Sequence, residues 1–122
     1  MESLQQDELL IAITEGNPLI IKWTGVCQDK NPGASINPYF DKIAAELGPD
    51  PVIVSFTELD YMNSSTISPI IYMCKLLDKK NIKTVLQYNK ASDWQHAVFK
   101  GLNTLSRMMK NITVEAVDLP AK

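Results

Sequence analysis

The 122-residue sequence contains only two cysteines and a single histidine. Without a Cys-x-x-Cys pair or a second histidine, it lacks the usual ligands of a structural zinc site. A disulfide between Cys27 and Cys74 is conceivable, but a domain of this size does not need one, and we expect two free thiols. We expect Cys74 on the buried face of a helix, as a small core residue, and Cys27 in a loop.

Clusters of basic residues and long apolar runs are also lacking. The net charge of -2 and the pI of about 5.3 give no electrostatic footprint for binding nucleic acid. The apolar runs, such as residues 9–13, are far shorter than the roughly 20 residues of a membrane-spanning helix. The first eight residues contain no Lys or Arg, so we expect no secretory signal. These features predict a cytoplasmic protein that binds neither nucleic acid nor a membrane.

Motifs for catalysis or nucleotide binding are missing as well. The sequence has no Walker loop, no Gly-x-Gly-x-x-Gly and no Gly-x-Ser-x-Gly elbow. The lone histidine, His96, lies inside a predicted helix, where a surface or half-buried position is expected. The carboxylates are scattered without the spacing of an acid and base pair: Asp41, Glu46, Glu58 and Asp60. We expect no enzymatic activity, no catalytic residue, no metal and no cofactor.

Strand and helix patterns alternate along the chain. Residues 9–14 and 19–24 are rich in β-forming residues and flank a turn at 15–18, which predicts a hairpin. The first of these segments could instead close a short helix that begins at Ser3. Further strands are predicted at 51–56, 82–88 and 112–117.

Three helices are predicted between these strands. The first begins with Asn37 as N-cap and Pro38 at the first helical position, and ends at Gly48-Pro49. The second runs roughly over 64–79, and the third begins near Ser92-Asp93.

This order of elements implies right-handed crossovers and, with the leading hairpin, a mixed sheet. We predict one α/β domain over residues 1–122, with about four or five strands and about three or four helices packed on the sheet. The expected core consists of apolar residues from the strands and the second helix: Ile53, Val54, Phe56, Ile67, Ile70, Ile71, Cys74, Val85 and Leu86.

Three consecutive hydroxyl residues, 64–66, stand at the predicted start of the second helix. Asn63 is expected to be its N-cap, with the side chain accepting a backbone N–H. A helical projection places Ser64, Ser68 and Lys75 on an exposed face beside Tyr72. The hydroxyls could simply satisfy N–H groups at the helix start. A functional interpretation is a phosphorylation switch, because a phosphate of about -1.5 to -2 charge changes what the adjacent surface can bind.

The strand, the short turn and the hydroxyl-rich helix start resemble the STAS-domain family, typified by bacterial anti-sigma-factor antagonists. The usual motif of that family, Asp-Ser-Ser/Thr-Gly, reads Asn63-Ser64-Ser65-Thr66 here, after Tyr61-Met62. An Asn followed by hydroxyl residues is also similar to the STAS-like adaptors that control a diguanylate cyclase. Asn63 replaces the acid and Thr66 replaces the glycine, so the match supports the fold more than a conventional sigma-factor pathway.

The resemblance implies a non-enzymatic, phospho-regulated adaptor that switches between protein partners. Ser64 is the expected phosphoacceptor and Ser65 the second choice. The implied partners are a serine kinase of the anti-sigma-factor-like ATPase type, a phosphatase and a downstream target such as a diguanylate cyclase. The expected partner-binding surface combines the helix with the preceding polar loop: Thr66, Ser68, Tyr72, Lys75, Asp29 and Asn31.

Three alternatives stay open at this point. The loop at 28–33 could be a solvated turn without a partner. The chain could be a constitutive STAS-type interaction module, in which residues 63–66 only cap a helix. It could also bind a small molecule or nucleotide in a pocket at the helix N-terminus.

Overall fold

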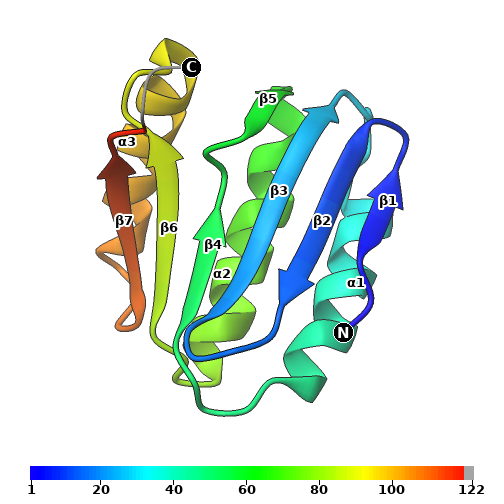
Figure 1. Cartoon of the computed structure of the whole chain (residues 1–122), viewed down its shortest axis with the longest axis vertical. Helices are drawn as coiled ribbons and strands as arrows, with labels where there is room; N and C mark the ends of the chain where they lie inside the picture. The colour runs from blue at the N-terminus through cyan, green and yellow to red at the C-terminus, as the bar shows by residue number, and fades with distance from the viewer. Residues whose placement is uncertain (120–122) are drawn as a thin grey trace.

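The computed structural model describes residues 1–119 and contains one mixed sheet of seven strands (Figure 1). The strands are β1 (Leu4–Gln6), β2 (Leu9–Thr14), β3 (Leu19–Cys27), β4 (Val52–Ser55), β5 (Leu59–Met62), β6 (Thr84–Asn89) and β7 (Ile112–Val117). The helices are α1 (Gly33–Glu46), α2 (Ile67–Lys79) and α3 (Asp93–Ser106), and a 3-10 turn, η1 (Ser64–Thr66), leads directly into α2.

The strand order is β1-β2-β3-β4-β6-β7, with β5 paired to β3. The hairpin predicted for the first two long strands is confirmed, because β2 and β3 pair antiparallel. From β3 onward the pairs β3–β4, β4–β6 and β6–β7 are parallel. The predicted α/β class and mixed sheet are therefore confirmed, whereas the predicted strand number was too low because β1 and β5 were missed.

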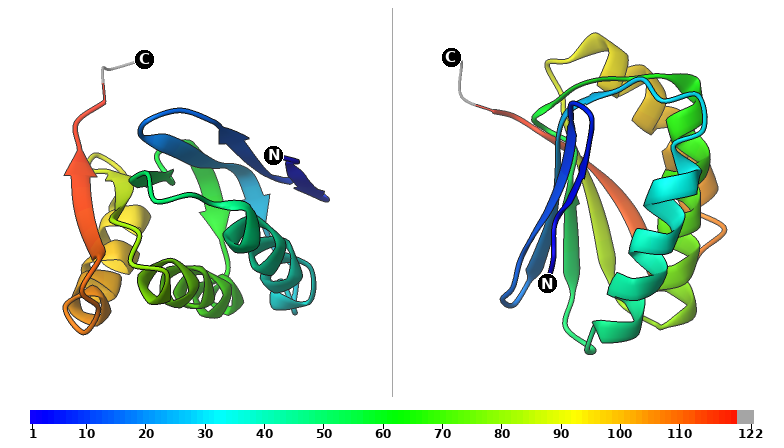
Figure 2. Two further views of the ribbon diagram at one scale, coloured as in Figure 1. Left: turned by 90° about the horizontal axis from the view of Figure 1, so that it is seen from below. Right: turned by 90° about the vertical axis from the view of Figure 1, so that its right-hand side faces the viewer.

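All three helices cover the same face of the sheet (Figure 2). From β3 the parallel strands follow one another in a single direction across the sheet. A right-handed crossover is expected at each step, and crossovers of one hand in one direction place every helix on the same side. The other face carries no helix within the described residues.

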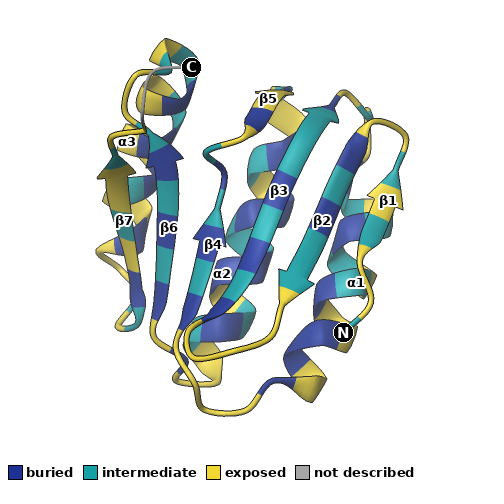
Figure 3. Ribbon diagram, viewed as in Figure 1, coloured by how far each residue is buried: buried dark blue, intermediate teal, exposed yellow. Residues whose placement is uncertain are grey.

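Burial follows this one-sided arrangement (Figure 3). In β4 and β6 the helix-facing residues Val54 and Leu86 are buried, as predicted, together with Phe56 in the loop after β4. Ile53 and Val85 were predicted to be core, but they are only half-buried because they point to the uncovered face. On α2 the prediction is right for Ile70 and Cys74, while Ile67 and Ile71 are half-buried at the helix flank.

The first helix begins earlier than the sequence predicted. It starts at Gly33 rather than at Pro38, and Pro38 lies inside it. The preceding turn initiates the helix, because the Asn31 carbonyl accepts the backbone N–H of Ala34 at 3.2 Å. Pro38 lies at an exposed position near the N-terminal end of α1, and the hydrogen bond that it cannot donate is the one to the carbonyl of Ala34, which is also an exposed residue.

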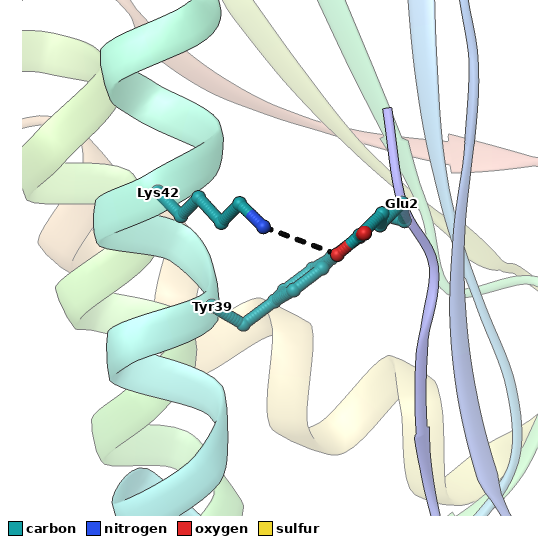
Figure 4. Close-up of polar contacts among 3 residues, drawn as sticks. All are labelled: Glu2, Tyr39 and Lys42. Carbon is teal, nitrogen blue, oxygen red and sulfur yellow. Dashed lines mark hydrogen bonds and ion pairs between the residues drawn. The ribbon is translucent and has the colours of Figure 1, made fainter.

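The N-terminal residues are tied to α1 across the edge of the sheet (Figure 4). The Tyr39 hydroxyl donates to the backbone carbonyl of Glu2 at 2.7 Å, and Lys42 Nζ lies 3.1 Å from the Glu2 carboxylate. These contacts anchor the residues before the short edge strand β1 to α1, while β1 itself pairs antiparallel with β2. Among residues 1–119, none of the helices has the length and apolar character needed to cross a membrane.

Candidate functional site

The hydroxyl motif is positioned by the second half of β3. β4 pairs with β3 over Leu19–Lys22, and β5 pairs with it over Gly25–Cys27 after a shift in register at Gly25/Val26. Gly25 has φ +89°, and a Cβ at this position would lie 1.9 Å from the carbonyl oxygen of Glu8. Only glycine fits at this position. The register shift next to it therefore sets the course of β5 along β3 and the position of Asn63, which follows β5.

Asn63 and Thr66 form the frame under the motif. The Asn63 backbone N–H donates to the Cys27 carbonyl at 3.0 Å, and its Nδ2 donates to the Asp29 carbonyl at 2.8 Å. The Thr66 hydroxyl lies 2.9 Å from Asn63 Oδ1 and 3.1 Å from Cys27 Sγ. The turn is therefore attached to the end of β3 and to the loop that follows it.

Asn63 occupies the N-cap position, but not with the predicted contact. Its side chain accepts no backbone N–H from the helix, because Oδ1 faces the Thr66 hydroxyl instead. The backbone carbonyl of Asn63 accepts the N–H of Thr66 at 3.1 Å. The side chain thus links the turn to the loop before α1.

The three hydroxyl residues differ in exposure. Ser64 and Ser65 are exposed, whereas Thr66 is fully buried. The assignment of Thr66 to a partner-binding surface was therefore wrong, because its methyl and hydroxyl groups face the interior. Ser68 and Lys75 are exposed on the following turns of α2. Ser64 and Ser65 are exposed at the start of the same helical segment.

The remaining residues predicted for the partner surface come from α2 and from the loop before α1. Tyr72 is half-buried as a residue, but its hydroxyl is exposed and donates to the Asp41 carboxylate of α1, which joins the two helices. This bond is the main reason why the pKa of the Tyr72 hydroxyl is raised. In the loop before α1, the Asp29 carboxylate accepts the Asn31 backbone N–H at 2.9 Å, while the Asn31 side chain is exposed.

Two residues that support the site were not predicted. Cys27, expected in a loop, ends β3 and is buried against Thr66. Gln95 of α3 is buried, and its Nε2 donates to the carbonyls of Phe56 at 2.8 Å and Leu59 at 2.9 Å. These contacts fix the loop between β4 and β5, and no local sequence pattern indicates a contact across such a separation.

The N-terminal part of the chain, which includes the motif, is rich in acidic residues. A hollow of about 350 Å³ beside the end of β3 is lined by Asp7, Glu8 and Asp29 among others. Residues 1–74 contain ten Asp and Glu but only three Lys and no Arg. Within residues 1–119, no Lys or Arg side chain forms an ion pair or hydrogen bond with residues 63–66. Among the described residues, Ser64 therefore has no Lys or Arg bound to it in this structure.

Metal binding, acid–base chemistry and thiol chemistry have little support in the described residues. Within the described residues, no group of three His, Cys, Asp or Glu side chains is arranged to hold a metal ion. His96 is exposed, and its Nδ1 lies 3.3 Å from the Tyr88 hydroxyl, on α3 rather than beside the serines. Cys27 and Cys74 are both free and buried.

The sequence matches the family model of the STAS domain over residues 4–113. A solved structure of an uncharacterized protein with a SpoIIAA-like fold, from Shewanella loihica, aligns with 14% identity and a TM-score of 0.49. The alignment covers 94% of this chain and 91% of that one. Among curated proteins, none matches the sequence.

Proposed function

The chain belongs to the STAS-domain family, and on that basis we propose that it is a non-enzymatic, phospho-regulated adaptor that switches between protein partners. Ser64 is the proposed phosphoacceptor and Ser65 the second choice. The proposed partners are a serine kinase, a phosphatase and a downstream target such as a diguanylate cyclase, and the proposed location is the cytoplasm.

The observation that carries this proposal is that the four residues of the motif, 63–66, differ in exposure and in hydrogen bonding. Ser64 and Ser65 are exposed on a turn whose other two side chains, Asn63 and Thr66, are fixed by hydrogen bonds. A kinase can reach the two serines without unfolding the turn. The frame beneath them keeps the acceptor at one place on the surface.

A phosphate at this turn is expected to preserve the fold. It would stand where the first backbone N–H groups of the helix have no intrahelical partner and where the helix dipole favours negative charge. Its charge of about -1.5 to -2 would add to an already acidic part of the chain. A partner that buries Ser64 would then have to desolvate this charge, and its affinity would fall if it supplied no cation of its own.

The proposal is tested by comparing Ser64→Ala and Ser64→Asp as tagged proteins in the cells of the source organism. Proteins captured by each variant are quantified by mass spectrometry. At least one partner should be retained by Ser64→Ala and lost from Ser64→Asp. Thr104→Asp, at an exposed position on α3, controls for added charge elsewhere. Identical sets of partners for the two Ser64 variants would contradict the switch.

A constitutive STAS-type interaction module is the second candidate. It is favoured by the contacts of Asn63 and Thr66, which give half of the motif a structural role that needs no phosphate. The same capture experiment distinguishes the candidates, because a constitutive module binds its partners equally well with Ala or Asp at position 64.

A further inference from the structure

Three exposed lysines lie near the starts of β6 and β7: Lys79, Lys83 and Lys110. Each lysine is next in sequence to a member of one hydrogen-bonded group. In this group the Asn111 carbonyl accepts the backbone N–H of Thr84 at 2.8 Å, and the Asn111 backbone N–H donates to the Asp78 carboxylate at 2.9 Å. These bonds join the loop before β6 to the loop before β7, so the three lysines lie on one part of the surface.

The positive charges of these lysines are not paired. Among residues 1–119, none of the three ammonium groups forms an ion pair or a hydrogen bond. Asp78 is engaged by Asn111, whose Nδ2 lies 3.0 Å from the Asp78 carboxylate. Lys80, in the same loop, is engaged as well, because its Nζ donates to the Leu47 carbonyl at 3.2 Å. This part of the surface therefore presents three unpaired cations to the solvent.

Acidic residues line a hollow at the start of β3. The hollow measures about 290 Å³, and its wall includes Leu19, the first residue of β3, together with Glu15, Glu46 and Asp50. The Glu15 carboxylate lies 3.6 Å from the N-terminal amine. Glu46 and Asp50 are exposed, and neither carboxylate has an ion pair or a hydrogen bond among the described residues. The hollow therefore offers two unpaired anions to a cationic side chain.

The hollow and the lysines lie on the same edge of the sheet, which is the lower edge in Figure 1. The first residues of the four parallel strands pair in a single row: Leu19, Val52, Thr84 and Ile112. The hollow lies at the β3 end of this row, and the lysines lie at the β6–β7 end. With strands about 4.8 Å apart, the two groups of charge are separated by roughly 10–15 Å. The edge is thus acidic at one end of the row and basic at the other.

From this arrangement we propose that the edge binds the same edge of a second copy of the chain, in a two-fold symmetric dimer. The two-fold axis runs perpendicular to the sheet, between β4 and β6. It sets the start of β3 in one copy against the starts of β6 and β7 in the other, so the acids of each copy face the lysines of its partner and every contact occurs twice. A partner of uniform charge would meet like charge at one end of the row, whereas a second copy complements both ends.

The proposed dimer leaves the serine motif of each copy free. β3 extends about 26 Å from Leu19 to Cys27 at about 3.3 Å per residue. The motif lies at the far end of this strand, where the Asn63 backbone N–H donates to the Cys27 carbonyl at 3.0 Å. The two motifs therefore lie at the outer ends of the dimer, and dimerisation does not depend on phosphorylation of Ser64. Two motifs in one particle also allow a partner with two binding sites to gain avidity.

Sedimentation velocity of the full, unphosphorylated chain tests the proposal. A concentration-dependent dimer is expected at low salt, and added salt should weaken it because exposed ion pairs are screened. Two double variants reverse the charges, Lys83→Glu with Lys110→Glu and Glu46→Lys with Asp50→Lys. Each alone should dimerise at least about tenfold more weakly, because its reversed residues face like charge. An equimolar mixture of the two should form a heterodimer, because opposite charges then meet at every contact.

A matched control reverses two exposed lysines at the opposite edge of the sheet. Lys30→Glu with Lys90→Glu makes the same change in net charge after the carboxyl ends of β3 and β6, and it should leave dimerisation unchanged. Thermal unfolding of every variant checks that the chain is folded.

A wild-type chain that stays monomeric at low salt, up to about 1 mM protein, would overturn the proposal. So would a dimer that both charge-reversal variants retain, or a mixture of the two variants that does not associate. A monomer that binds heparin through Lys83 and Lys110 would identify a polyanion as the ligand of the basic end instead. The Ser64 capture experiment gives its own result in each of these cases, because the edge and the serine motif do not share residues.

Discussion

Thr66 turns its hydroxyl toward the side chain of Asn63, with 2.9 Å between Oγ1 and Oδ1, and so is removed from the surface that its two neighbouring serines share. The same asparagine uses its Nδ2 to hold the Asp29 carbonyl in the loop before α1. Two residues of the motif thus build the turn, and the other two are presented to solvent.

The first prediction concerns the coupling between these two side chains. Thr66→Val keeps the shape of the buried residue but removes the donor to Asn63, and we expect a loss of about 1–2 kcal/mol in the free energy of unfolding. A double-mutant cycle with Asn63→Ala, measured by urea denaturation, should give a coupling of about 1 kcal/mol. The matched cycle of Asn63→Ala with Ser64→Ala should be additive. Additivity in both cycles would show that the Asn63–Thr66 contact contributes nothing.

The second prediction concerns Gln95. Gln95→Ala leaves the buried carbonyls of Phe56 and Leu59 without their donor, and we expect a loss of about 3 kcal/mol or more. Gln87→Ala is the matched control, because Gln87 makes one exposed contact, to Glu115 at 3.0 Å, and should cost less than about 1 kcal/mol. Equal losses in urea denaturation would contradict the role assigned to Gln95.

The third prediction compares two glycines. Gly25→Ala places a Cβ 1.9 Å from the Glu8 carbonyl oxygen at a positive φ, and we expect a loss of about 2 kcal/mol or more. Gly101→Ala meets no atom within 4 Å in the interior of α3, and it should stabilise the protein by about 1 kcal/mol. Thermal unfolding of both variants measures the difference. If Gly25→Ala left the stability unchanged, β3 would not need a glycine at its register shift.

The fourth prediction concerns alkaline pH. Burial, with a smaller contribution from Asp78, raises the pKa of the Cys74 thiol from 9.0 to about 12. Burial, with a smaller contribution from Glu2, raises the pKa of the Tyr39 hydroxyl from 10.0 to about 12. Because the unfolded chain releases these protons at lower pH than the folded chain, their contribution is fully present below about pH 9 and is lost as the pH rises toward about 12.

Urea denaturation across that pH range measures this loss. Cys74→Ala and Tyr39→Phe should each lose less stability than the wild type between about pH 9 and about pH 11. A pH dependence unchanged in both variants would show that neither group has a raised pKa in the folded protein.

The sequence predicted the long elements of the fold well. The apolar runs of β2, β3, β4, β6 and β7 are bounded by turn residues, so local patterns were enough to find them. β1 and β5 are three and four residues long and contain polar residues, and they exist because neighbouring strands offer them hydrogen-bonding partners. The start of α1 was misplaced because Asn37-Pro38 is a good local start signal, whereas the preceding turn begins the helix at Gly33.

The site could be predicted only in part. Local sequence was sufficient to place Ser64 at the start of the helical segment, where an exposed hydroxyl was expected. It could not show that Thr66 is buried, because the atoms that surround it include Cys27, 39 residues away in the sequence. Gln95 was missed for the same reason, since it reaches carbonyls 36 and 39 residues earlier.

The most direct test of the proposed switch is peptide mass spectrometry on the protein isolated from the cells of its source organism under several growth and stress conditions. The account predicts a phosphate on Ser64, or on Ser65, in at least one condition, and none on the buried Thr66. Unmodified serines in every condition, with the peptide covering residues 63–66 fully observed, would contradict it and would leave the constitutive interaction module as the function of this domain.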